Sequence, residues 1–421
     1  MHGVSVIIPV FNNWDLTASC LRSLQAAPPE AEFEVLVVDN ASSDATASLL
    51  TGFGADVFGE RFRPLVNAEN RNFAGACNQG AQAARHEHCF FLNNDTRLTQ
   101  GWHAPLANRL EEEPGLGGIG PLLLYDDGTV QHLGAGVYPD RGIGHYYSRI
   151  PGTHALAKKR RTLRYITAAA LLMRRDVFLE TGGFCEEFIN GLEDVDLCWR
   201  LGQGGYHVSV EPDSVIYHLE GQSRGREQTA PTGNVAVLDR RCPTFRQPEF
   251  HRIAAQDGYE PYFDMFFATL LRPTRERLER YSALLPTASA ATLRAILGRE
   301  IYWQEGWHRL AALLEAEPGA QGGAEAALAC LLECSRFFPT PETISAAGIC
   351  AGRSGRLDLA AESAASLARA RALLEQPEFF HSKYERILAT AEHLKDPLLL
   401  RMIRQWRSDF GPHVLPVLRP E

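Results

Sequence analysis

The sequence predicts an α/β protein with a mostly parallel sheet, followed by an all-helical C-terminal part. Three observations lead to this prediction. Short apolar runs alternate with helix-like segments through the first quarter of the chain. These runs are apolar throughout, which is typical of parallel strands covered on both faces. From about residue 273, apolar residues recur three and four apart between Pro or Gly breaks, which indicates helical hairpins.

Four strands and three helices are expected in the first quarter. The apolar runs at 4–11, 33–40, 63–67 and 89–95 are the strands. After the first strand, Leu16, Cys20 and Leu24 recur with the spacing of one helix face. The second helix opens with Ser and Asp at 42–44, which are typical capping residues. The third is rich in small residues and runs from Phe73 to Arg85.

Length and composition indicate two soluble domains. The chain has 421 residues, more than one core usually organises. We predict domains at 1–230 and 273–421, joined by a connecting segment at 231–272. The net charge of −9 argues against nucleic-acid binding. No apolar stretch is long enough to span a membrane, and the N-terminus lacks a secretory signal pattern, so we expect a cytoplasmic protein.

Two familiar site patterns are excluded by their context. The nine cysteines contain no C-x-x-C pair and no zinc-finger spacing, so we interpret them as reduced thiols. The glycines of "GLGGIG" at 115–120 match G-x-G-x-x-G but do not follow a strand, so they do not predict a dinucleotide site. No P-loop sequence is present.

Polar residues follow each of the four expected strands. Carboxyl ends of parallel strands meet at one edge of a sheet, where ligands bind in such folds. Asn and Asp also favour turns and helix caps, which accounts for about half of these positions. The remainder suggest a ligand crevice, in which a divalent cation held by oxygens such as those of Asp95 would bind a diphosphate. The polar residues that follow the four expected strands are Asn12, Asn13, Asp39, Asn40, Asn67, Asn70, Arg71, Asn72, Asn93, Asn94 and Asp95.

The stretch "GLEDVDLCWRLG" at 191–202 concentrates three carboxylates before a helical run. Acidic residues in a first helical turn stabilise a helix, so capping alone explains part of this pattern. Asp196 and Arg200 are spaced for an ion pair. Because successive residues rotate by 100°, Asp194 and Asp196 point nearly opposite ways. Asp194 is therefore treated separately from Asp196.

An ordered set of motifs resembles a known family. "SVIIPVFNN", "VLVVDNASSDAT", "NFAGACNQG", "FLNNDT", "RRDVFLETGGFCEEF" and "GLEDVDLCWR" together resemble inverting glycosyltransferases of family 2 with the GT-A fold. They are most similar to the branch that holds rhamnosyltransferases and galactofuranosyltransferases. The resemblance covers about residues 4–225 and does not extend to the helical part.

The resemblance implies a role for each matching residue. It implies a nucleotide-sugar donor, an acceptor hydroxyl on a glycan or a protein, and Mn²⁺ or Mg²⁺ as cofactor. It also implies that Asp194 is the catalytic base, with Glu193 contacting the acceptor or supporting the helix start. Asp95 would bind the metal, and His218 would be either a second ligand or a structural residue. The implied donor-binding residues are Pro9, Phe11, Asn12, Asp39, Asn70, Arg71, Asn93 and Asn94.

Two departures from the family pattern affect the donor site. Asn93 stands where the metal-binding signature often has an acid, which leaves one fewer anionic ligand. Asn72 stands where many relatives have Gly, a change that Asn tolerates because it accepts left-handed backbone angles.

Other readings of the chain remain open at this point. One alternative is a catalytically silent scaffold whose helical domain binds partners, and another is a sugar-nucleotide pyrophosphorylase. The basic segment 145–164 is either a solvated loop or a lid over the crevice. The helical domain would buttress the first domain, bind an acceptor or partner, or mediate homo-oligomerisation.

Overall fold

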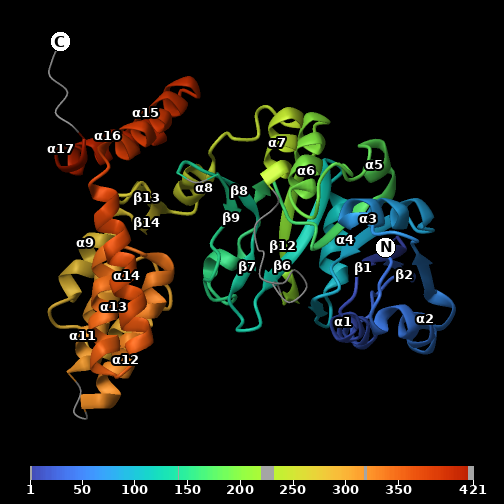
Figure 1. Cartoon of the computed structure of the whole chain (residues 1–421), viewed down its shortest axis with the longest axis horizontal. Coiled ribbons are helices and arrows are strands. Elements are labelled where there is room, and N and C mark those ends of the chain that lie inside the picture. Colours follow the sequence, from blue (N-terminus) through green and yellow to red (C-terminus); the bar gives the residue numbers. More distant parts are fainter. Residues whose placement is uncertain (1, 141, 220–231, 317–319, 416–421) are drawn as a thin grey trace. The chain divides into compact units, whose positions relative to one another are not determined.

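The computed structural model describes residues 2–140, 142–219, 232–316 and 320–415 (Figure 1). The chain forms two compact units. The first comprises residues 1–136 and 143–247, and the second comprises 137–142 and 248–421. Residues 232–247 therefore belong to the first unit, and residues 248–272 belong to the second.

A ten-stranded mixed sheet organises the first unit, with its longest path in the order β10-β12-β6-β11-β4-β1-β2-β3. β5 pairs with β12 and β7 pairs with β6 at its margins. The strands are β1 (Val4–Val10), β2 (Phe33–Asp39), β3 (Phe62–Val66), β4 (His88–Leu92), β5 (Thr96–Leu98), β6 (Leu116–Leu124), β7 (Val130–His132), β10 (Thr162–Leu163), β11 (Ala170–Arg174) and β12 (His207–His218).

The long strands, apart from β11, run in one direction. β1 pairs in parallel with β2 and β4, β2 with β3, and β6 with β12. β11 is antiparallel to both β4 and β6, so it reverses the direction only at its own position. The predicted α/β fold with a mostly parallel sheet is therefore confirmed. The carboxyl ends of β1, β2, β4 and β12 lie along the same edge of the sheet.

Helices cover both faces of this sheet because its strands are apolar on both sides. Side chains of α1, α2 and α4 join alternate residues of β1 in one core, including Leu21, Leu50 and Leu106. On the other face, Gly80 of α3 packs on Ile7 of β1, and Phe178 of α5 packs on Phe91 of β4. The helices are α1 (Trp14–Ala26), α2 (Ala45–Phe58), α3 (Asn72–Ala83), α4 (His103–Glu112), α5 (Arg175–Glu180), α6 (Glu193–Gln203) and α7 (Thr232–Arg241).

The second unit is built mainly of helices, as the 3.6-residue periodicity predicts. It contains α8 (Phe250–Gln256), the hairpin β13 (Tyr259–Phe263) and β14 (Thr269–Pro273), α9 (Arg275–Leu284), α10 (Ala290–Leu297), α11 (Gln304–Glu315), α12 (Ala320–Phe337), α13 (Pro341–Arg353), α14 (Leu357–Leu374), α15 (Pro377–His393), α16 (Pro397–Asp409) and α17 (Gly411–Val414). A separate two-stranded sheet pairs β8 (Ala135–Tyr138) with β9 (Gly142–His145).

Apolar side chains gather around two groups of helices among the described residues of the second unit. One cluster lies around α11, α12 and α13 and includes Trp303 and Leu310. The other lies around α15 and α16, where Trp406 stacks on Phe267 with ring centroids 3.9 Å apart.

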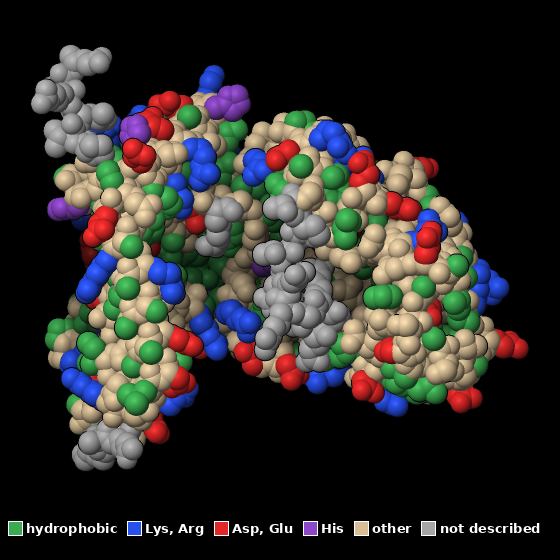
Figure 2. Space-filling model, in the orientation of Figure 1, with side chains coloured by type: hydrophobic (Ala, Val, Ile, Leu, Met, Phe, Trp, Pro, Cys, Tyr) green, Lys and Arg blue, Asp and Glu red, His purple; other side chains and the backbone are tan. Residues whose placement is uncertain are grey.

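Acidic and basic side chains both lie on the surface. Figure 2 shows acidic and basic side chains interspersed on the face that it presents. Within the described part of the chain, none of the helices has the length and apolar character needed to cross a membrane.

Candidate active site at the carboxyl edge of the sheet

The loop after β1 and the end of β2 form a polar corner at the carboxyl edge. Asn12 has φ 57°, which lets its side-chain oxygen accept hydrogen bonds from the backbone amides of Ser43 (2.8 Å) and Asp44 (3.3 Å). Asp39 is 3% exposed, and its carboxylate accepts from the backbone amide of Ser42 at 2.9 Å. Beside them, Phe11 is 48% exposed. This corner therefore offers an aromatic face next to polar side chains.

Asn40 organises the turn at residues 67–72, which we call the donor turn. Its amide nitrogen donates to the carbonyl of Asn72 at 2.9 Å, and its amide oxygen accepts from the side chain of Asn67 at 2.9 Å. Asn72 has φ 56°, so Asn takes the left-handed conformation where many relatives have Gly. Asn70 and Arg71 are exposed on this turn. Both therefore point to the surface where the resemblance requires nucleotide contacts.

Asp95 and His218 meet because β5 pairs with the end of β12. His218 lies opposite Thr96 in this pairing, and the amide of Leu219 donates to the carbonyl of Asp95 at 2.8 Å. The Asp95 Oδ1 and His218 Nε2 atoms are 3.1 Å apart, and both side chains are almost fully buried. The structure thus brings together the two residues predicted as metal ligands.

The side chains around His218 suit a divalent cation. Nδ1 of His218 lies 2.8 Å from the side-chain oxygen of Gln131, which can only accept, so Nδ1 carries a proton. In the neutral ring Nε2 then presents a lone pair, and a carboxylate oxygen 3.1 Å away also only accepts. Two acceptor atoms at this distance need a proton or a metal ion between them. Partners of this kind orient metal-ligating histidines in proteins.

The described residues contain no cluster of three or more His, Cys, Asp or Glu side chains suited to hold a metal. Mg²⁺ and similar cations commonly bind through one or two carboxylates together with substrate phosphates. A site with two protein ligands fits that mode, so Asp95 and His218 are compatible with a cation that arrives with a diphosphate.

The two asparagines before Asp95 differ in their surroundings. Asn93 lies near the metal candidates, with its amide nitrogen 3.4 Å from His218 Nε2. Asn94 instead donates to Thr17 Oγ1 of α1 at 2.9 Å. The amide nitrogen of Asn94 therefore holds α1 in place, whereas Asn93 faces the site.

Asp194 reaches the same edge from the start of α6. Its Oδ2 accepts from the amide of Ala168 at 3.3 Å, and its Oδ1 accepts from the amide of Val195 at 2.8 Å. The next residue, Ala169, accepts from the amide of Asn93 at 2.9 Å. Asp194 is thus connected to the Asn93–Asp95 segment through two adjacent residues at the start of β11.

The surroundings of Asp194 favour its protonated form. Burial raises the pKa of this carboxyl group above its ordinary value, although hydrogen bonds from Ala168 and Val195 and the charge of His145 act in the opposite direction. The residue as a whole is half-buried. A carboxylate with a raised pKa is a more effective proton acceptor near neutral pH.

The other two carboxylates of the 191–202 stretch have structural contacts. Glu193 is 5% exposed, and its carboxylate accepts from the amide of Gly191 at 2.6 Å, which supports the helix start. Asp196 is fully buried and pairs with Arg200 at 2.7 Å and with Arg241 of α7 at 2.7 Å. The predicted ion pair of Asp196 with Arg200 is confirmed.

A pair of histidines at this edge was not predicted. His132 and His145 contact each other through their Nδ1 atoms at 2.8 Å. Nε2 of His132 accepts a hydrogen bond from the backbone amide of Thr167. Thr167 directly precedes Ala168, whose amide binds Asp194. Burial and the charges of His145 and His218 keep the pKa of His132 well below its ordinary value. The pairing depends on the fold-back of residues 132–145, for which the sequence has no periodic signal.

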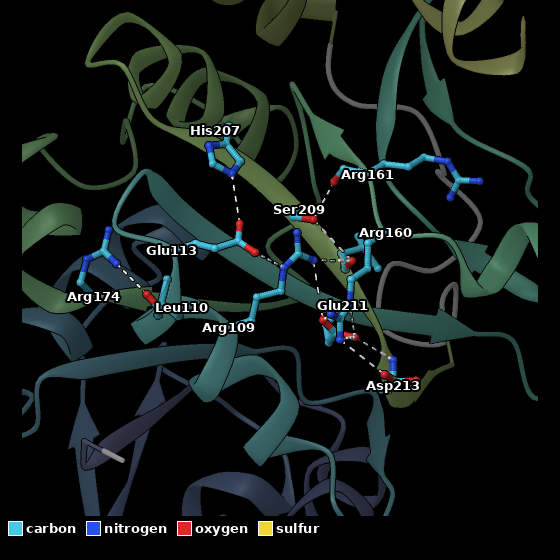
Figure 3. A network of polar contacts seen from close by, with 11 residues as sticks. Arg109, Leu110, Glu113, Arg160, Arg161, Arg174, His207, Ser209, Glu211 and Asp213 are labelled. Atoms are coloured by element: carbon cyan, nitrogen blue, oxygen red, sulfur yellow. Dashed lines mark hydrogen bonds and ion pairs between the residues drawn. The ribbon is translucent and has the colours of Figure 1, made fainter. Parts of the chain in front are cut away.

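The basic segment 145–164 is packed against the first unit. Tyr146, Ile150 and Leu156 in it are almost fully buried. Figure 3 shows Arg160 directed at Glu211 of β12, with the shortest nitrogen–oxygen distance being 3.0 Å. The backbone carbonyl of Arg161 accepts from Ser209 Oγ at 2.6 Å. The charge of Arg160 and the backbone of Arg161 therefore anchor this segment to β12.

Comparisons with known proteins agree with this architecture. Residues 5–182 match the family model "Glycosyl transferase family 2". An uncharacterised protein, y4gI, of Sinorhizobium fredii is 31% identical over 54% of this chain and 25% of its own length. The O-antigen biosynthesis protein RfbC of Myxococcus xanthus is 31% identical over 52% of this chain and 18% of its own length. The chain thus spans a quarter or less of these two relatives.

Two further matches have named activities. An N-acetylglucosaminyl-diphospho-decaprenol L-rhamnosyltransferase of Mycobacterium tuberculosis is 29% identical over 49% of this chain and 73% of its own length. Among solved structures, a mannosyltransferase of Pyrobaculum calidifontis in complex with GDP-Man and Mn²⁺ is 18% identical, covers 87% of each chain and has a TM-score of 0.42. Over residues 5–182, the first unit of this chain is therefore similar to the glycosyltransferases of family 2.

Proposed function

We propose that the first unit transfers a sugar from a nucleoside diphosphate donor to an acceptor hydroxyl, with inversion at the anomeric carbon. One observation carries the proposal. Asp194 and the Asn93–Asp95 segment, which lie about 100 residues apart in sequence, are connected at one edge through Ala168 and Ala169. A base and a diphosphate site at one edge are what this transfer requires.

The donor would bind across the carboxyl ends of β1 and β2. Phe11 and Pro9 would contact the nucleobase, and Asn12 and Asp39 would bind the base or ribose. Arg71, which is 41% exposed at its side chain, would bind an anionic part of the donor. Asn70 lies on the same exposed turn, and Asn93 lies nearer the ribose.

Asp95 and His218 would hold the divalent cation. When bound there, Mn²⁺ or Mg²⁺ would neutralise negative charge on the leaving diphosphate. Asp95 supplies an oxygen ligand and His218 a nitrogen ligand, and Gln131 keeps the imidazole oriented.

Asp194 would take the proton of the acceptor hydroxyl. In an inverting transfer the hydroxyl attacks from the side opposite the leaving group, so the base must lie across from the diphosphate. The amide of Ala168 holds one carboxylate oxygen in place. The raised pKa of the group increases its strength as a base.

We further propose that the second unit binds the acceptor or a protein partner. It offers large exposed apolar side chains on neighbouring helices, including Ile349 at 54% and Leu357 at 72% exposure. The transferred sugar would be a hexose or deoxyhexose, in line with the named rhamnosyltransferase relative.

A donor panel tests the proposed function. Purified protein is incubated with UDP-, GDP- and dTDP-linked sugars and Mn²⁺ or Mg²⁺, and the released nucleotide is measured with water as acceptor. We expect slow hydrolysis of at least one donor, abolished by a chelator and restored by added Mn²⁺. Absence of hydrolysis and of nucleotide binding across the panel would favour a catalytically silent scaffold.

A further inference from the structure

The segment that leads into Asp194 has a strained backbone. We call residues 184–192 the base loop, because α6 and Asp194 follow directly. Its last three residues, Asn190, Gly191 and Leu192, have φ of 48°, 145° and 72°. Leu rarely adopts such angles, since its Cβ crowds the backbone. Conformations of this kind persist only when surrounding contacts enforce them.

On one side, the base loop is attached to the donor turn and α3. The side-chain oxygen of Asn190 accepts from the backbone amide of Phe73 at 3.1 Å. Glu186 pairs with Arg71 at 3.3 Å and accepts from Asn78 at 3.0 Å. Arg71 is a proposed donor ligand and Phe73 follows the donor turn directly. The base loop therefore touches the segment that a nucleotide would contact.

On the other side, the base loop is attached to α7 by one buried residue. Asn234 is 2% exposed. Its amide nitrogen donates to the carbonyls of Ile189 (3.0 Å) and Gly191 (2.7 Å), and its amide oxygen accepts from the amide of Ile189 (3.1 Å). These three bonds use both donors of the amide and fix the backbone on either side of Asn190. α6 and α7 also lie side by side (Figure 1), bridged by the Asp196–Arg241 ion pair.

We propose that Asn190 and Asn234 are positioning residues that couple the donor turn to the catalytic base. Asn234 fixes the base loop against α7, and Asn190 connects the fixed loop to the first turn of α3. A nucleotide that orders the donor turn thereby also orders the backbone four residues before Asp194. The inference rests on the proposed function, because it assigns the donor turn to a nucleotide.

Three substitutions at position 190 separate the hydrogen bond from the backbone angle. Asn190→Asp keeps an acceptor oxygen and tolerates a left-handed backbone. Asn190→Gly keeps the backbone angle and removes the acceptor. Asn190→Ala removes both. At position 234, Asn234→Asp keeps the shape of the side chain and removes the two donors. Glu187→Gln is the matched control, because Glu187 lies in the same loop and pairs at the surface with Arg240 of α7.

The first measurement is amide hydrogen exchange in residues 189–196, with and without saturating UDP, GDP or dTDP and Mn²⁺. In the wild type, Asn190→Asp and Glu187→Gln, we expect the bound nucleotide to slow exchange at least fivefold. In Asn190→Gly we expect no nucleotide-dependent slowing. In Asn234→Asp we expect exchange in this segment to be faster even without nucleotide.

The second measurement separates turnover from donor binding. We expect Asn190→Gly and Asn234→Asp to lower kcat of donor hydrolysis 10- to 100-fold, while the nucleotide dissociation constant changes less than threefold. If the nucleotide still slows amide exchange in Asn190→Gly and its kcat equals that of the wild type, the proposed coupling of the donor turn to the base is wrong. If the wild type binds none of the nucleotides, the proposed function itself fails. Unaltered exchange in Asn234→Asp would refute the proposal that Asn234 fixes the base loop, independently of any ligand.

Discussion

Asp194 in the first unit and Asp396 in the second are both largely enclosed carboxylates, yet their surroundings act on the charge in opposite ways. Asp396 is 4% exposed and accepts from the amides of Leu398 and Leu399 at the start of α16 and from His251 Nε2 at 2.8 Å. Burial acts to raise the pKa of Asp396, but these hydrogen bonds, His251 and Arg252 outweigh it and the pKa is lowered. At Asp194 burial outweighs the hydrogen bonds, and the pKa is raised.

The difference separates a structural carboxylate from a reactive one. Around Asp396 every close contact favours the ionised form, so the charge stabilises the helix start. Around Asp194 hydrogen bonds hold the carboxylate in place, but burial disfavours its ionised form. Groups in that condition are typical of functional sites, where stability is exchanged for reactivity. The following predictions, ordered from the largest expected effect to the smallest, test this contrast.

The largest effect is expected for Asp194→Asn. Loss of the base should lower turnover about 10³-fold or more, since general base catalysis typically contributes about 10²–10⁴. The dissociation constant of the nucleotide should change less than twofold, because Asp194 is assigned to the acceptor hydroxyl and not to the nucleotide. Steady-state kinetics and calorimetry on the same preparation measure both quantities. Turnover within tenfold of the wild type would remove Asp194 from the role of base.

A smaller effect is expected for Asp95→Asn. This substitution keeps the shape of the side chain and removes the anionic ligand. Nucleotide affinity measured with Mn²⁺ should fall about 100-fold. Loss of a residue that only supports a metal ligand typically costs about 10–100-fold, and loss of the ligand itself should cost at least as much. Affinity measured in chelator should be the same for the variant and the wild type. Asn94→Ala is the matched control, and equal losses in the two variants would contradict the assignment.

Asp396→Ala should destabilise the second unit by about 2–3 kcal/mol, from loss of a helix cap and of the buried partner of His251. Trp406, which is in the adjacent core, reports the urea midpoint by fluorescence. Asp358→Ala is the control, because Asp358 pairs with Arg356 at the surface and should shift the urea midpoint far less than Asp396→Ala. Similar midpoints for the two variants would show that the Asp396 contacts are not stabilising.

The two carboxylates should also respond oppositely to pH. The folded pKa of Asp396 is lowered, so its stabilisation is present above the ordinary value of 3.8 and is lost as pH falls through the folded pKa. The folded pKa of Asp194 is raised, so its contribution is largest below 3.8 and is lost as pH rises through the folded pKa. Across a range from below 3.8 to about 7, Asp396→Asn should therefore weaken relative to the wild type as pH rises to 3.8, and Asp194→Asn should strengthen relative to the wild type as pH rises beyond 3.8. Urea midpoints across this range give the two slopes, and slopes of equal sign would refute the contrast.

The smallest effect is expected at the surface of the network in Figure 3. Arg160 is 57% exposed at its side chain, although its partner Glu211 is fully buried. Arg160→Ala should cost about 1 kcal/mol or less, because a solvated arginine gains little from an ion pair. Glu211→Ala should cost more than Arg160→Ala, because it also leaves the buried Arg109 without its 3.6 Å partner. Thermal denaturation of the two variants compares them directly.

Much of the fold was predictable because local patterns determined it. The strands β1 to β4 and the helices between them lie within a few residues of the apolar runs that predicted them. Asp44 caps α2 through the amide of Thr46, as the Ser- and Asp-rich start indicated. The direction of β11 was not predictable, since a short buried strand has the same composition whether it runs parallel or antiparallel.

The candidate site was predictable where residues follow strands and not where they meet across distant segments. Asp95 and Asp194 follow recognisable elements, and so does His218. The contact between His132 and His145 requires the chain to fold back between these residues, and no periodic pattern in the sequence predicts this. Asn234 is a single polar residue in a weakly patterned helix, and only its three bonds to the base loop distinguish it. Side-chain amides that bind backbone leave no trace in sequence spacing.

The reversed direction of β11 has a consequence for how this chain tolerates insertions and deletions. Because β11 runs against its neighbours, the residues just before it lie at the carboxyl edge, where the amide of Ala168 holds Asp194 and the carbonyl of Ala169 holds Asn93. Backbone groups alternate in direction along an extended chain, so a shift of one residue would turn this amide away. An indel between 164 and 170 would therefore remove the hydrogen bond to Asp194, although Asp95 and Asp194 would stay intact in an alignment.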